Sequence, residues 1–208
     1  MGSIRRSCVA VLACLACLGG AAAARAGDDP LLAPAGTCAA DDQLQLDQAA
    51  AQQSMLCLTN WARTQSGLPA LRLDQTLNEA GRTKLAADVS CGEFTHTPCG
   101  NPFSAVFATY LAGARGYQIG ENIAWGTGHY GTPRETMDGW LKSPGHRANI
   151  LTAAFRDLGV GYLANQSFQG YGGATLWSQE FGARDGAPAA QPAPVVKKRP
   201  ARKHARRR

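Results

Sequence analysis

Apolar residues recur at helical spacing in two stretches of the first half of the chain. Residues 46–64 are mostly helix formers, and Met55, Leu58 and Trp61 fall at three-residue spacing on one side. A second apolar stripe runs through residues 74–90, and the aspartate that opens this range is a favourable N-cap. The pattern therefore predicts two amphipathic helices.

The second half of the chain alternates between strand and helix signals. Residues 119–125 are partly β-branched and bounded by glycine, and a Thr-Pro pair opens a predicted helix over residues 132–142. Two further strands are predicted at residues 157–163 and 174–181, joined by the Gly-rich segment 165–173 as a hairpin. Helices placed before and between short strands predict an α/β fold whose sheet is covered on both faces.

Composition divides the chain into four parts. Residues 1–26 have a positively charged start, a short apolar run and an A-x-A pattern ending at Ala26, which predict a cleavable signal peptide. Residues 27–45 are expected to be a linker, residues 46–182 one domain, and residues 183–208 a disordered Ala/Pro-rich basic tail. We therefore expect a secreted or periplasmic monomer without a transmembrane segment.

The net charge of +6 is unevenly distributed. Of the 21 Lys and Arg residues, eight lie in residues 197–208 and three in residues 1–26, which leaves ten against 15 Asp and Glu in residues 27–185. The predicted domain is thus acidic, and only the tail is basic. The tail is a candidate for binding an anionic cell-surface polymer, or else it is simply a solvated segment. The domain offers no element that would read a nucleic-acid sequence.

Four cysteines remain after the predicted signal peptide: Cys38, Cys57, Cys91 and Cys99. An even number in an oxidising compartment predicts two disulfides. Three connectivities are possible, and we favour Cys38 with Cys57 and Cys91 with Cys99. The second bridge would close a short loop around His96 and so hold this residue in place.

His96, Glu121 and His146 form a candidate His/Glu/His cluster because glycines and prolines place them near the ends of elements. Two imidazoles and a carboxylate can hold zinc or another divalent cation. The alternative is a hydrogen-bonded network that ties loop, sheet and helix together. Ser143 lies three residues before His146, which could act as its base, and Glu121 could orient the imidazole. Ser143 and Glu121 are therefore the candidates for a catalytic role.

The chain also contains an ordered set of motifs that resembles bacterial members of the CAP superfamily, the cysteine-rich secretory proteins, antigen 5 and pathogenesis-related 1 proteins. The likeness covers about residues 56–182. The motifs are Leu56-x-x-x-Asn60-x-x-Arg63-x-x-x-Gly67-Leu68-x-x-Leu71, Phe94-Thr95-His96, Gly120-Glu121-Asn122-Ile123-Ala124, Trp140-Leu141-x-Ser143-Pro144-Gly145-His146-Arg147-x-Asn149-Ile150-Leu151, Gly159-Val160-Gly161 and Trp177-x-Gln179-x-Phe181.

The resemblance implies an α-β-α sandwich with a central, mostly antiparallel sheet and an open cleft lined by two histidines and two acidic residues. The histidines correspond to His96 and His146, and the first acid to Glu121. The second acid of eukaryotic members falls on Ser143, which departs from the pattern. Glu135 lies two turns before Ser143 on the same predicted helix, roughly on the same side.

Two classes of function follow from these residues. The favoured class is an extracellular binding module whose cleft holds a small or lipid ligand or a divalent cation, and residues 103–111 are candidates to line or cover that cleft. The alternative is a metal-assisted, peptidase-like hydrolase with Glu121 as general base. Enzymatic activity is left open by the sequence, which favours binding because the full set of acids is absent.

Overall fold

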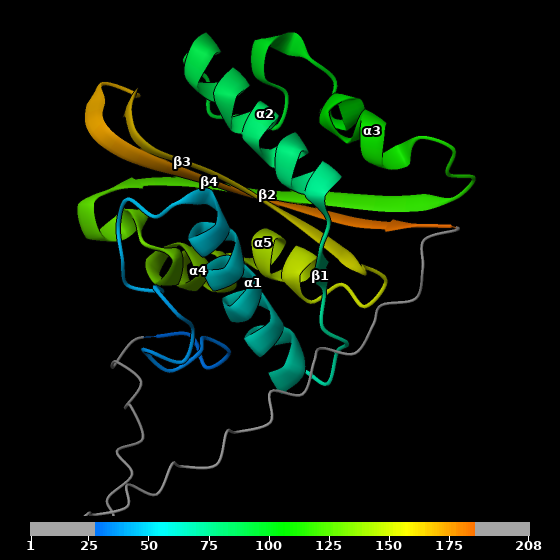
Figure 1. The fold of residues 1–208 in the computed structure, drawn as a ribbon, viewed down its shortest axis with the longest axis horizontal. Coiled ribbons are helices and arrows are strands. Elements are labelled where there is room, and N and C mark those ends of the chain that lie inside the picture. Colours follow the sequence, from blue (N-terminus) through cyan, green and yellow to red (C-terminus); the bar gives the residue numbers. More distant parts are fainter. Residues whose placement is uncertain (1–27, 186–208) are drawn as a thin grey trace, which may run out of the picture.

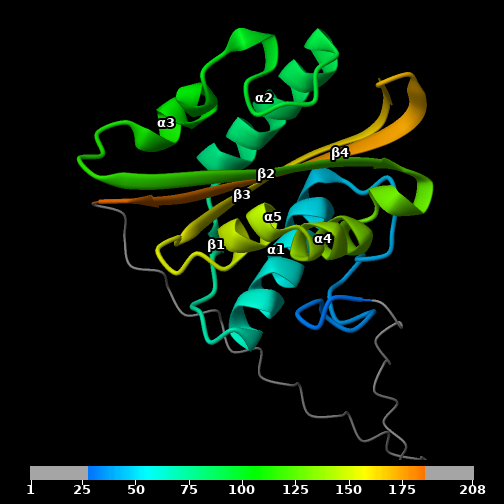
Figure 2. The ribbon, with the colours of Figure 1, turned by 180° about the vertical axis from the view of Figure 1, so that it is seen from behind.

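A central sheet separates two layers of helices in the computed structural model, which describes residues 28–185. Figure 1 and the reverse view in Figure 2 show that one sheet face carries α2 and α3, and the other carries α1, α4 and α5. The predicted α-β-α arrangement is confirmed. The helices are α1 (Gln48–Gln65), α2 (Gln75–Cys91), α3 (Ala108–Leu111), α4 (Pro133–Lys142) and α5 (Pro144–Ile150), with short 3-10 turns at Pro98–Gly100, Phe103–Phe107 and Gly128–Gly131.

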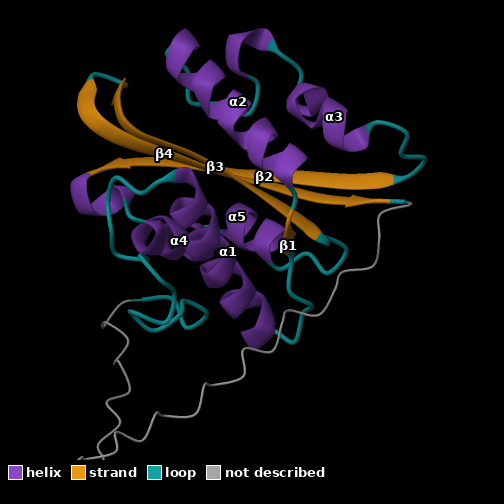
Figure 3. Cartoon of the chain, viewed as in Figure 1, coloured by secondary structure: helices purple, strands orange, loops and turns teal. Residues whose placement is uncertain are grey.

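The sheet has four strands in the order β1-β3-β4-β2 (Figure 3). They are β1 (Arg72–Leu73), β2 (Tyr117–Thr127), β3 (Asp157–Phe168) and β4 (Tyr171–Arg184). Strand β4 pairs antiparallel with both β2 and β3, and only the two-residue β1 pairs parallel, with β3. The sheet is therefore mostly antiparallel, as expected, and β2 forms one of its edges.

Local capping residues set the beginnings of the helices where the sequence predicted them. The Oδ1 atom of Asp74 accepts from the backbone N–H of Thr76 at 2.9 Å and opens α2. Thr132 precedes Pro133 at the start of α4 and accepts from the N–H of Glu135. These side chains satisfy N–H groups that lack a partner within the helix.

The strands extend further than the sequence indicated. The segment 165–173, predicted as a loop, is mostly strand, and only the residues between β3 and β4 form the turn. Gln169 and Gly170 in that turn have φ of 53° and 81°. Strand β4 continues to Arg184, so the tail boundary predicted at residue 183 was too early. Pairing of β4 with β2 supplies the hydrogen bonds that local propensity could not predict.

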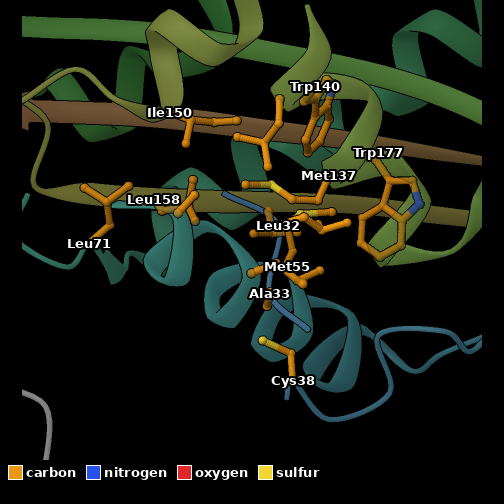
Figure 4. Packing of buried hydrophobic residues seen from close by; sticks show 14 of the residues in the cluster. Leu32, Ala33, Cys38, Met55, Leu71, Met137, Trp140, Ile150, Leu158 and Trp177 are labelled. Carbon is orange, nitrogen blue, oxygen red and sulfur yellow. The ribbon is translucent and has the colours of Figure 1, made fainter. Parts of the chain in front are cut away.

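The main core lies between the sheet and the layer of α1, α4 and α5 (Figure 4). It includes Met55 of α1 and Trp177 of β4, both fully buried. Leu32, Ala33 and Cys38 belong to the same cluster, although they come from the predicted linker. The N-terminal segment, residues 28–45, has no helix or strand of its own but is packed into the core.

Both predicted disulfides are confirmed. Cys38 is bridged to Cys57 of α1, and Cys91 at the end of α2 is bridged to Cys99. The first bridge fastens the N-terminal segment to α1. The second closes the loop that carries His96.

Two predicted segments lie mostly or wholly outside the described residues: the signal peptide over residues 1–26 and the basic tail over residues 183–208. Within residues 28–185, no helix is both long and apolar enough to cross a membrane.

Candidate functional site

His96 lies in the loop after α2, over the sheet face that α2 covers. The loop is held by the Cys91–Cys99 bridge and by Lys84 of α2, whose Nζ donates to the carbonyl oxygen of Thr95 at 2.5 Å. Lys84 is 1 % exposed and also contacts both carboxylate oxygens of Asp88, at 2.8 and 2.7 Å. A buried ion pair within α2 thus anchors the loop at the residue before His96.

Glu121 of β2 fixes the orientation of the His96 ring. The Nδ1 atom of His96 lies 2.5 Å from Oε1 of Glu121, and the side chains are 53 % and 1 % exposed. The hydrogen bond to Glu121 raises the pKa of His96, although partial burial opposes this. This pair therefore favours a protonated imidazolium beside a carboxylate.

A second carboxylate, Glu180, lies next to Glu121 because the two residues are directly opposite each other in β4 and β2. Glu180 is fully buried, and neither of its oxygens has a hydrogen-bond partner among the described residues. Burial raises the pKa of Glu180 well above its usual value, and the charge of Glu121 adds to this effect.

Sequence reasoning missed this cluster of Lys84, Asp88 and Glu180 beside Glu121. One signal was available: position 180 is charged, and it lies in the predicted strand 174–181 of a sheet expected to be covered on both faces. The second acid of the family pattern falls on Ser143 in this chain, and Glu180 of β4 lies opposite Glu121. The register of β2 and β4 brings the two acids together.

Ser143 and His146 lie near the connection between α4 and α5, on the opposite face of the sheet. Asn122 of β2 donates from Nδ2 to the backbone carbonyl of His146 at 3.1 Å, which ties α5 to the edge strand. Burial lowers the pKa of His146, and the charge of His96 lowers it further. The Ser143 side chain makes no capping hydrogen bond to α5.

The edge strand β2 is held against α4 and α5 by side chains that satisfy its outward carbonyl groups. The indole N–H of Trp140 donates to the carbonyl of Ile123 at 3.1 Å. The amide of Asn149 donates to the carbonyl of Glu121 at 3.0 Å. The sheet edge is thus closed at Glu121 and Ile123, and Ile123 and Trp140 also belong to the wall of a cleft.

Ser143 and His146 line a cleft of about 360 Å³ that borders β2. Its walls combine aromatic and aliphatic side chains with a few polar groups. The lining residues are Phe94, Ile123, Ala124, Trp125, Tyr130, Glu135, Thr136, Gly139, Trp140, Ser143 and His146.

His96 instead lines a separate hollow of about 240 Å³ between α2 and the segment that follows the loop. Phe103 borders the same hollow, and its ring meets that of His96 edge-on at 6.4 Å. The segment 103–111 was expected to line or cover the cleft. Its first residues line this hollow, and Phe107 and Tyr110 are fully buried beside Leu77 of α2. Of the four predicted cleft residues, His96 contacts Glu121, and Ser143 and His146 line the cleft beside β2.

The family resemblance implies a divalent cation bound by His96, Glu121 and His146. Among residues 28–185, no group of three or more His, Cys, Asp or Glu side chains is placed so that it could hold a metal ion. The Nδ1 atom of His96 is already engaged by Glu121. The arrangement does not fit a centre with three such ligands, and no step below passes through a metal.

Comparison with known proteins places the fold and these motifs in a family. The chain is 34% identical over 136 residues to the uncharacterized protein YkwD of Bacillus subtilis (strain 168), covering 64% of this chain and 47% of that protein. It is 31% identical over 129 residues to the uncharacterized membrane protein YlbC of the same strain, covering 58% of this chain and 34% of that protein. The match thus spans about half or less of these curated relatives.

A solved structure and a family model also match this chain. An extracellular protein containing a SCP domain from Bacillus anthracis str. Ames superposes with a TM-score of 0.52 at 26% identity, covering 64% of this chain and 40% of that chain. The model of the cysteine-rich secretory protein family, CAP, matches residues 56–181. This chain therefore belongs to the CAP family of cysteine-rich secretory proteins.

Proposed function

We propose that this protein is an extracellular binding module that holds a small, largely apolar ligand in the cleft beside β2. The observation that carries the proposal is the cleft itself: a hollow of about 360 Å³ with aromatic walls and few polar groups. Ligand pockets generally combine an apolar lining with a few placed polar side chains. Secretion is supported by the disulfides and by the extracellular relative.

A hydrolase is supported less well by the geometry. Nucleophilic catalysis would need Ser143 and a base to act together with an oriented third group. Glu121 instead pairs with His96 and is not among the residues that line the cleft with Ser143 and His146. We therefore favour binding over catalysis.

A neutral fluorescent probe, N-phenyl-1-naphthylamine, tests the binding proposal. Gly139 lines the cleft, and a Cβ atom built there meets no atom within 4 Å, so Gly139→Phe should fill the cleft without a clash in the fold. Gly145→Phe is the matched control because Gly145 is equally unobstructed but lies outside the lining. We expect the probe to bind the parent and Gly145→Phe, and to bind Gly139→Phe at least about tenfold more weakly, a loss of about 1.4 kcal/mol. Equal binding by all three proteins would refute the proposal.

Two further expectations stay predictions. Zinc binding through His96, Glu121 and His146 has no support from the geometry described above, and calorimetry on the parent and a His96→Ala/His146→Ala variant tests it. One-to-one binding lost in the variant would establish the site in spite of that geometry. Binding of the basic tail to an anionic surface polymer concerns residues outside the described range. It is tested by sedimentation with the polymer, comparing the full mature chain with one that ends at residue 185.

A further inference from the structure

Aromatic side chains form much of the cleft wall, and two of them are exposed to solvent. Phe94 and Tyr130 are 40% and 73% exposed, although both line the cleft. Trp125 also lines the cleft, and its ring meets that of Tyr171, which is 58% exposed, at 5.5 Å. Soluble proteins seldom expose several aromatic side chains together without a binding role.

The charged side chain of the cleft lining is a carboxylate, and the basic His129 that pairs with it lies outside the lining. None of the described lining residues is Lys or Arg, whereas Glu135 contributes a carboxylate. Glu135 is 22% exposed, and its Oε1 lies 2.9 Å from Nε2 of His129. Asp and Glu also outnumber Lys and Arg in residues 27–185 as a whole. An anionic ligand would meet no fixed positive side chain in this lining.

We infer that the cleft selects small organic cations, in which an amine or quaternary ammonium group is carried on a compact apolar body. The faces of Trp, Tyr and Phe rings attract such cations through their quadrupoles. The carboxylate of Glu135 adds attraction of the same sign. This inference rests on the proposed function, because it specifies the ligand class for the same cleft. The volume of about 360 Å³ suits a free small molecule.

Three probes of one shape separate charge from size. Choline carries a trimethylammonium group, 3,3-dimethylbutan-1-ol has the same shape without charge, and 3,3-dimethylbutanoate is an anion of similar size. Binding to the full mature chain is followed by tryptophan fluorescence, since Trp125 and Trp140 line the cleft. We expect choline to bind about tenfold more tightly than the alcohol, and the anion to bind most weakly. Equal binding of choline and the alcohol, or preference for the anion, would overturn the inference.

Two pairs of variants locate the preference. Glu135→Gln and Tyr130→Leu should each reduce the choline-to-alcohol ratio about threefold or more. Glu79→Gln and Tyr117→Leu are the controls, because both residues are exposed and lie outside the lining, and they should leave the ratio unchanged. A ratio that falls equally in the control variants would also overturn the inference.

The two proposals fail in distinguishable ways. If N-phenyl-1-naphthylamine binds in the cleft but the choline-to-alcohol ratio is one, the cleft is a binding site without charge selection and only this inference fails. If Gly139→Phe affects neither the neutral probe nor choline, the cleft is not the binding site and both proposals fail.

Discussion

Glu180 is a residue whose ionisation opposes folding. It is fully buried beside Glu121, and its oxygens lack hydrogen-bond partners among the described residues. A carboxylate in this position loses its hydration and meets a neighbouring charge, so the protonated form is favoured in the folded state. In the unfolded chain Glu180 ionises near its ordinary pKa of 4.5.

Replacing Glu180 by Gln should therefore stabilise the protein in a pH-dependent way. Below pH 4.5 the residue is protonated in both states, so the substitution changes the free energy of unfolding little. Above that pH the unfolded state gains stability from ionisation and the folded state does not, so parental stability falls and the advantage of Glu180→Gln grows. We expect that advantage to be larger by about 1–3 kcal/mol at pH 8 than at pH 4.

Urea unfolding of both proteins between pH 4 and pH 8 measures this difference. Glu79→Gln provides the control because Glu79 is exposed on α2. Parallel pH profiles for the parent and Glu180→Gln would contradict the assignment of a raised pKa to Glu180.

At the scale of elements, the sequence predicted what depends on neighbours in the chain. Asp74 and Thr132 begin α2 and α4 as predicted, because a cap acts on N–H groups two or three residues away. The extent of β3 and β4 was underestimated, because their pairing with each other and with β2 decides where these strands end.

The difference between local and long-range contacts also explains which site residues were predicted and which were missed. His96 and Glu121 stand in short local motifs that can be read from the sequence, and their side chains are in contact. Glu180 and Lys84 were missed because their relation to Glu121 depends on strand register and on the packing of α2, which connect residues far apart in the chain.

The packing of α2 on the sheet requires glycines on both elements. A Cβ atom at Gly161 of β3 would lie 2.5 Å from the carbonyl carbon of Gly81 in α2, which is closer than real contacts allow. Gly161→Ala should thus push α2 away from the sheet and cost about 1–3 kcal/mol of stability. Displacement of α2 would also move Lys84, which anchors the loop before His96.

Gly145→Ala in α5 is the matched control, since a Cβ atom there meets nothing within 4 Å. Alanine is the better helix former, so this variant should be as stable as the parent or slightly more stable. Thermal unfolding of the two variants compares them directly. A loss of stability in Gly161→Ala no greater than that in Gly145→Ala would show that α2 tolerates the displacement.

For the whole molecule, the N-terminal segment is part of the folded unit. Leu32 and Ala33 are buried in the main core, and Cys38 is bridged to α1. Ion pairs reinforce the packing: Arg134 of α4 is 1 % exposed, and its Nη2 contacts Oδ2 of Asp28 at 2.5 Å. Composition alone predicted a linker here. The segment is rich in Ala, Gly, Pro and Asp, and its few apolar residues form no periodic pattern.

Two leucines of this segment test whether it stabilises the domain. Leu32 is 6% exposed in the core, whereas Leu44 is 44% exposed. Leu32→Ala removes buried methyl groups and should cost about 2–4 kcal/mol, while Leu44→Ala should change stability by less than about 0.5 kcal/mol. Chemical denaturation with the disulfides intact measures both values. Equal, small effects would mean that residues 28–45 behave as a linker, whereas the predicted difference means that the domain is stabilised by packing that begins before α1.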